Sequence, residues 1–124
     1  MKTKPLTFLL ALTFLFLFSG SVFADDFQDG VDAFKRKDYE TAYQLWLPFA
    51  EQGVASVQSN LGAMHEEGKG VPQDYVSAHM WWNLSGSNGY KDAVTDRNIV
   101  EKKMTKQQIE KAQEMARNWK PTKK

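Results

Sequence analysis

The chain has 124 residues, a formal net charge of +1 and no cysteine. The missing cysteines exclude disulfides, a thiol nucleophile and the cysteine through which bacterial lipid anchors are attached. With 16 basic and 15 acidic residues, the basic excess is too small for a nucleic-acid-binding surface.

Residues 1–24 have the pattern of a secretory signal peptide. Lys2 and Lys4 precede an apolar run over residues 6–18, followed by Ser19-Gly20-Ser21 and the tripeptide Val22-Phe23-Ala24. The pattern predicts a cut after Ala24 and export to the periplasm or out of the cell. The alternative is an uncleaved membrane anchor, but a spanning helix needs about 20 apolar residues and this run is shorter. No membrane attachment is expected after cleavage.

A 36-residue repeat organises residues 38–89. Each copy begins with an aspartate where a helix N-cap belongs and ends with a glycine where a left-handed terminal residue belongs. Between them, apolar or small side chains recur every three or four residues, which predicts a helix with one buried face. The paired positions are Asp38 and Asp74, Tyr39 and Tyr75, Ala42 and Ala78, Trp46 and Trp82, and Gly53 and Gly89.

An earlier helix is expected before each of these, over residues 26–37 and 55–67. Gly30 and Gly62 lie inside these helices, where glycine costs about 1 kcal/mol relative to alanine, so they indicate close helix-to-helix approach. The first copy turns tightly at Lys37-Asp38, and the second has a longer loop with two glycines and a proline.

After Gly89 the sequence predicts a helix over residues 90–103 and another from Thr105, which forms a capping box with Gln108. Pro121 ends that helix. The expected fold is all-α, one domain over residues 25–120 followed by a disordered tail over 121–124. It is a short α-α solenoid of antiparallel helix pairs (about 26–53, 55–89 and 90–119) with a C-terminal capping helix.

Residues 61–89 resemble a Sel1-like repeat (SLR), a relative of the tetratricopeptide repeat. The resemblance rests on Leu61, Gly62, Gly68, Gly70, Val71, Asp74, Ala78, Trp82 and Gly89. The first copy lacks the G-x-G-V loop and resembles a tetratricopeptide unit equally well. Residues 102–119 resemble the closing helix that often follows such repeats. The resemblance implies a scaffold for protein–protein contacts, commonly an adaptor in the bacterial envelope.

Two departures limit what the resemblance implies. His65 stands where the family usually has an aromatic residue, and the cysteines of the family's exported branch are missing. Binding or hydrolysis of β-lactams, known in that branch, is therefore not carried over.

No catalytic, cofactor or metal site is predicted. His65 and Glu66 begin a metal-binding pattern, but Lys69 fills the place of the second histidine in H-E-x-x-H. Two histidines alone cannot supply three zinc ligands. The favoured interpretation of His65-Glu66-Glu67 is a solvent-facing polar helix end.

The predicted partner site is the concave face, which the first helix of each pair lines in such solenoids. Trp46 and Trp119 are expected in the core. Trp81 and Trp82 point about 100° apart on their helix, so either both are structural or one reaches a surface where a partner binds. The candidates are Asp29, Asp32, Lys35, Arg36, Asn60, His65, Glu66 and Trp82.

The predicted function is that of an exported, non-catalytic interaction module of the bacterial cell envelope, binding a protein or peptide and no nucleic acid. Two alternatives stay open. One is a small hydrolase acting on cell-wall or β-lactam substrates, and the other is a structural repeat protein that assembles with its own copies.

Overall fold

The computed structural model describes residues 24–122, so the predicted signal peptide lies outside the described residues except for Ala24. Its regular elements are all helices, and this range contains no strand, which confirms the predicted all-α fold. No helix within it is long and apolar enough to cross a membrane.

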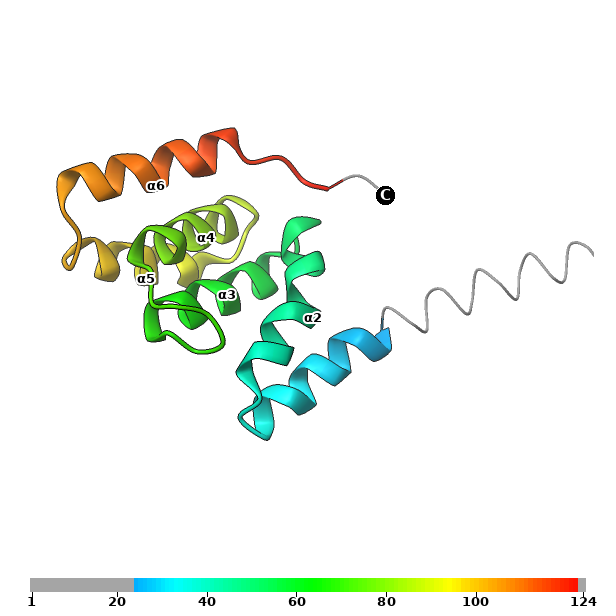
Figure 1. Ribbon diagram of the computed structural model, residues 1–124. Coiled ribbons are helices and arrows are strands. Elements are labelled where there is room, and N and C mark those ends of the chain that lie inside the picture. Colours follow the sequence, from blue (N-terminus) through cyan, green and yellow to red (C-terminus); the bar gives the residue numbers. More distant parts are fainter. Residues whose placement is uncertain (1–23, 123–124) are drawn as a thin grey trace, which may run out of the picture.

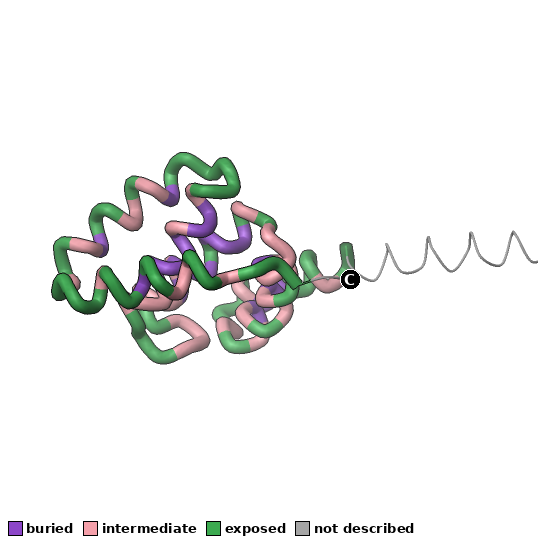
Figure 2. Tube along the Cα trace, turned by 90° about the horizontal axis from the view of Figure 1, so that it is seen from above, coloured by how far each residue is buried: buried purple, intermediate pink, exposed green. Residues whose placement is uncertain are grey.

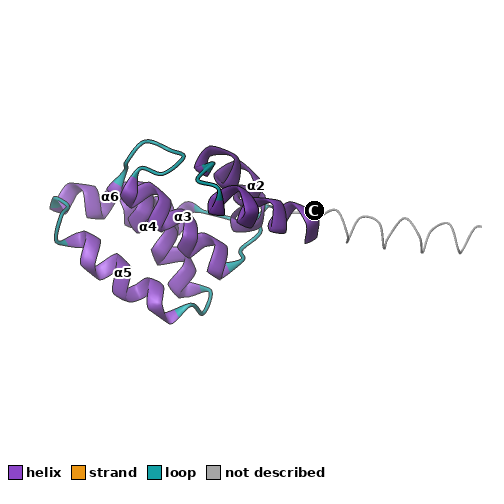
Figure 3. Cartoon of the chain, turned by 90° about the horizontal axis from the view of Figure 1, so that it is seen from below, coloured by secondary structure: helices purple, strands orange, loops and turns teal. Residues whose placement is uncertain are grey.

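The helices follow one another with short connections (Figure 1). A first helix over residues 24–35 and α2 (Tyr39–Glu51) form one hairpin. α3 (Ala55–Glu67) and α4 (Tyr75–Ser87) form the second. α5 (Lys91–Glu101) and α6 (Lys106–Asn118) complete the chain. Figure 3 shows how short the loops are relative to the helices.

The helix starts are capped as the sequence predicts. The Asp38 carboxylate accepts a hydrogen bond from the Thr41 N–H at 3.4 Å. Asp74 accepts one from the Ser77 N–H at 3.2 Å. Both bonds of the capping box between Thr105 and Gln108 are formed. Each cap satisfies backbone N–H groups that the first helical turn leaves without a partner.

The helix ends use left-handed residues. Gly53 and Gly89 have φ angles of 100° and 104°, as predicted, and Gly68 ends α3 with φ 69°. The tight turn after the first helix instead places Lys37, which has a Cβ, at φ 67°. There the Asp38 N–H donates to the Ala33 carbonyl at 2.8 Å.

A glycine under a tryptophan holds each hairpin together. A Cβ on Gly62 would lie 2.6 Å from Nε1 of Trp82, and a Cβ on Gly30 would collide with the Trp46 indole. The Trp82 indole N–H also donates to the Ser59 carbonyl at 3.1 Å, and that of Trp46 donates to Phe27 at 3.3 Å. We call these the Gly–Trp contacts. They confirm that both glycines mark close helix approach.

The buried residues form two clusters where the helices face one another, while the outer helix sides are exposed (Figure 2). The larger cluster joins the two hairpins and includes Trp46, Leu61 and Trp81. The smaller one, around Trp82 and Val100, attaches α5 to α4. The core therefore follows the repeats as two clusters, each formed where neighbouring helices pack, as expected for a solenoid.

The last two helices differ from the prediction. α5 and α6 both pack on α4, and their contact with each other is at most slight, so residues 90–119 do not form the packed helix pair that the sequence predicts. The reason lies in the apolar residues at the end of α6 and directly after it: Met115, Ala116 and Trp119 pack on the larger cluster. The segment after α6 then reaches the end of α2, where the Thr122 N–H donates to the Glu51 carbonyl at 2.7 Å. We call this segment, residues 119–122, the C-terminal tie.

Candidate functional site

A groove lies between the first helix and α3. Its volume is about 150 Å³. Four residues of α3 line it at positions i, i+3, i+4 and i+7, which is one face of that helix. The lining residues are Phe34, Trp46, Asn60, Ala63, Met64, Glu67 and Lys69. The groove thus spans both hairpins and has an apolar floor with polar groups at its edge.

The charges at the rim are held by contacts within the protein. Lys69 Nζ lies 2.8 Å from Glu67 Oε2 and 5.2 Å above the centre of the Tyr39 ring. The hydrogen bond and charge of Glu67 raise the pKa of Lys69, so its ammonium group stays charged. The loop after α3 packs closely against α2, because a Cβ on Gly70 would collide with the Tyr39 carbonyl.

Of the predicted partner-binding residues, only Asn60 lines the groove. Asp29, Asp32, Lys35 and Arg36 are exposed on or just after the first helix and do not line it. Glu66 is half-buried, and its carbonyl accepts a hydrogen bond from the Gln73 side chain at 2.7 Å. Trp82 is 3% exposed. Its placement at a partner surface is therefore wrong, because the Gly–Trp contact buries it.

Sequence reasoning missed most of the groove lining. Trp46 was expected in the core alone, but it also lines the groove together with Phe34 and Met64. The spacing of Asn60, Ala63, Met64 and Glu67 was the available signal, since it puts all four on one side of α3.

His65 is half-buried rather than solvent-facing, so that interpretation of the helix end is wrong for this residue. Its Nε2 is hydrogen-bonded to the Tyr43 hydroxyl at 2.8 Å. Its Nδ1 is buried and has no hydrogen-bond partner among the described residues. Burial lowers the pKa of His65, and the nearby Asp74 carboxylate opposes that shift.

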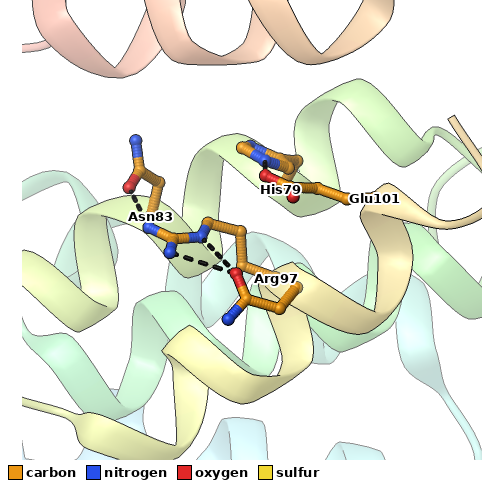
Figure 4. Close-up of polar contacts among 5 residues, drawn as sticks. His79, Asn83, Arg97 and Glu101 are labelled. Carbon is orange, nitrogen blue, oxygen red and sulfur yellow. Dashed lines mark hydrogen bonds and ion pairs between the residues drawn. The ribbon is translucent and has the colours of Figure 1, made fainter. Parts of the chain in front are cut away.

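His79 occupies the position of Tyr43 one repeat later. It is fully buried on α4, and its Nε2 lies 2.8 Å from Oε1 of Glu101 on α5 (Figure 4). Tyr43 and His79 are one 36-residue repeat apart, and so are His65 and Glu101. The same inter-repeat hydrogen bond is therefore built twice, with Tyr–His at one junction and His–Glu at the next.

A second polar contact joins α4 and α5 beside this pair. Arg97 Nη1 donates to the Asn83 side chain at 2.8 Å, as Figure 4 shows. Across residues 24–122, no group of three or more histidine, aspartate or glutamate side chains is placed to hold a metal ion. Both histidines are engaged in contacts between helices.

The Sel1 repeat model matches the chain twice, over residues 27–54 and 55–90. These two matches cover more than half of the sequence. The chain belongs to the Sel1 repeat family. Gly62 and Trp82, two of the residues on which the Sel1 resemblance rests, form the second Gly–Trp contact.

Among solved structures, the chain is similar to a protective antigen present in uropathogenic Escherichia coli strains that displays an SLR fold. The two are 30% identical with a TM-score of 0.73, over 78% of this chain and 22% of the antigen. The chain thus spans about a fifth of the antigen's length. No curated protein matches the chain significantly.

Proposed function

We propose that this chain is a non-catalytic interaction module, exported to the bacterial cell envelope, that binds a protein or peptide partner at the groove between the first helix and α3. The groove is the observation that carries the proposal. Its floor is apolar, and apolar pockets anchor partner side chains at interfaces. The repeat fold that carries it belongs to a family that serves protein interaction.

The positions of the histidines support a non-catalytic role. A general base needs to reach a reacting group, yet His79 is fully buried against Glu101 and His65 is hydrogen-bonded to Tyr43. Both interactions join neighbouring helices.

Affinity capture from the native envelope tests the binding role. The bait is the chain from Asp25, tagged after Lys124. Asn60→Trp places a large side chain at the groove edge, and Ser56→Trp is the matched control, because Ser56 is exposed on α3 and does not line the groove. We expect a partner to be enriched by the wild type and Ser56→Trp and lost with Asn60→Trp. If Asn60→Trp still captures the partner, the binding site lies outside the groove. If a folded bait captures no protein, the proposal of an interaction module is contradicted.

Export is tested separately. The signal-peptide pattern of residues 1–24 supports it. We expect cell fractionation and mass spectrometry to find a chain beginning at Asp25 outside the cytoplasm. Recovery of an intact N-terminus in the cytoplasm would overturn this part of the proposal.

A further inference from the structure

The volume of the groove limits what can enter it. A cavity of about 150 Å³ with aliphatic and aromatic walls accepts a benzene molecule, and the groove has this volume. It therefore has room for one large side chain.

The floor of the groove is apolar and packed. Trp46 and Met64 are 5% and 2% exposed, and both belong to the larger buried cluster, against which Phe34 also packs. A side chain that enters contacts a preformed surface, so little conformational entropy is lost by the protein on binding.

The rim offers no free charge to an incoming ion. Glu67 and Lys69 neutralise each other across 2.8 Å, and Lys69 also lies over the Tyr39 ring. A charged side chain entering the groove would lose water without gaining an unpaired countercharge, which is unfavourable. The charge distribution therefore fits an uncharged occupant.

Asn60 presents a polar side chain at the edge of the groove. It is exposed at the groove edge, and no residue between 24 and 122 forms a hydrogen bond with its side chain. A carboxamide carries both a donor and an acceptor and so matches both groups of a peptide unit.

We infer that the groove binds an extended peptide segment of the partner through one bulky uncharged side chain, of the size of phenylalanine or leucine, with Asn60 pairing to the adjacent backbone. This inference rests on the proposed function and names the chemistry of its ligand.

Peptide titrations test the inference. The probes are short Ser/Gly peptides that differ only in a central Phe, Leu, Ala, Lys or Glu. Binding is followed by NMR through the methyl signals of Ala63 and Met64. Burial of the side chain predicts that the Phe and Leu peptides bind at least about tenfold more tightly than the other three. Asn60→Trp should abolish this binding and Ser56→Trp should preserve it. Equal affinity for all peptides, shifts remote from Ala63 and Met64, or no binding of the Phe peptide overturns the inference.

Toluene provides a probe that has no backbone. At saturation it should shift the Ala63 and Met64 methyl signals in the wild type and leave them unchanged in Asn60→Trp. No shift in the wild type contradicts the size argument. A further outcome is that the peptides show no side-chain preference while Asn60→Trp still fails to capture the partner that the wild type captures. In that case the inferred ligand chemistry is wrong and the proposed interaction module stands. If the wild type also captures no partner, the inferred ligand chemistry and the proposed function are both wrong.

Discussion

The Trp82 indole covers Gly62, so that α3 and α4 approach each other at a point where no side chain separates them. The indole N–H is satisfied by the Ser59 carbonyl one turn earlier. The contact combines apolar burial, a buried hydrogen bond and helix spacing in one pair of residues, and it is repeated between Gly30 and Trp46.

Gly62→Ala tests this contact. Alanine is the better helix former by about 1 kcal/mol, but its Cβ would lie 2.6 Å from the Trp82 ring, and overpacking costs about 1–3 kcal/mol. We expect a net loss in the free energy of unfolding, measured by urea denaturation. Ser56→Ala, on the exposed side of α3, should leave stability unchanged or slightly higher. A Gly62→Ala protein more stable than wild type would show that the indole can move away at no cost.

Glu101→Ala tests the hydrogen bond between α4 and α5. It leaves Nε2 of the fully buried His79 without a partner, and an unsatisfied buried polar group costs about 1–3 kcal/mol. We expect lower stability and faster amide hydrogen exchange in α5. Glu101→Gln keeps an acceptor oxygen and should recover most of the stability.

The control for that pair is Glu110→Ala on the exposed side of α6. It should leave both measurements unchanged. Equal effects of Glu101→Ala and Glu110→Ala would mean that the contact with His79 contributes nothing.

His65 makes stability depend on pH. Burial lowers its pKa in the folded chain below the ordinary 6.5, against the opposing Asp74 charge. On acidification the unfolded chain therefore takes up this proton first. The contribution of His65 is complete above pH 6.5 and is lost as pH falls through the lower folded pKa.

Replacing the pair by His65→Phe with Tyr43→Phe should reduce this loss. The measurement is the free energy of unfolding at about pH 7.5 and about pH 5. The wild type should lose more stability between the two conditions than the double variant. An identical loss in both proteins would assign the acid sensitivity to other groups.

Asp74→Ala removes the cap of α4. Loss of an aspartate N-cap costs about 1 kcal/mol, because the Ser77 N–H loses its acceptor. We expect a lower thermal midpoint, with Asp74→Ser recovering part of it. Asp92→Ala, an exposed carboxylate in the first turn of α5, provides the comparison. A midpoint unchanged by Asp74→Ala would show that water replaces the cap without cost.

The repeat made most of the fold predictable. Asp38, Asp74, Gly53 and Gly89 mark helix ends through local backbone chemistry, which can be recognised without knowing the fold. The path of α6 was not predictable in this way, because its apolar stripe does not specify which helix it will cover. The prediction that Trp82 lies at a partner surface was wrong for the same reason, because the Gly–Trp contact that buries it joins residues on two different helices.

The groove was only partly predictable. The exposed position of Asn60 could be recognised from the helix period, whereas Phe34 and Met64 have both core and groove roles that no periodicity separates. The two hydrogen bonds between repeats, Tyr43–His65 and His79–Glu101, lie at equivalent positions 36 residues apart in the sequence. This spacing was visible in the sequence, but the distances that identify the hydrogen bonds come only from the structure.

The C-terminal tie changes how the domain should fold. In an open row of repeats, each unit contacts only its neighbours, and the end units can fray independently. Here the Thr122 N–H is bonded to Glu51, so the last helix cannot detach without exposing the first hairpin. Such a contact between distant parts of the chain raises contact order and slows folding. We therefore expect residues 24–122 to unfold in a single cooperative transition.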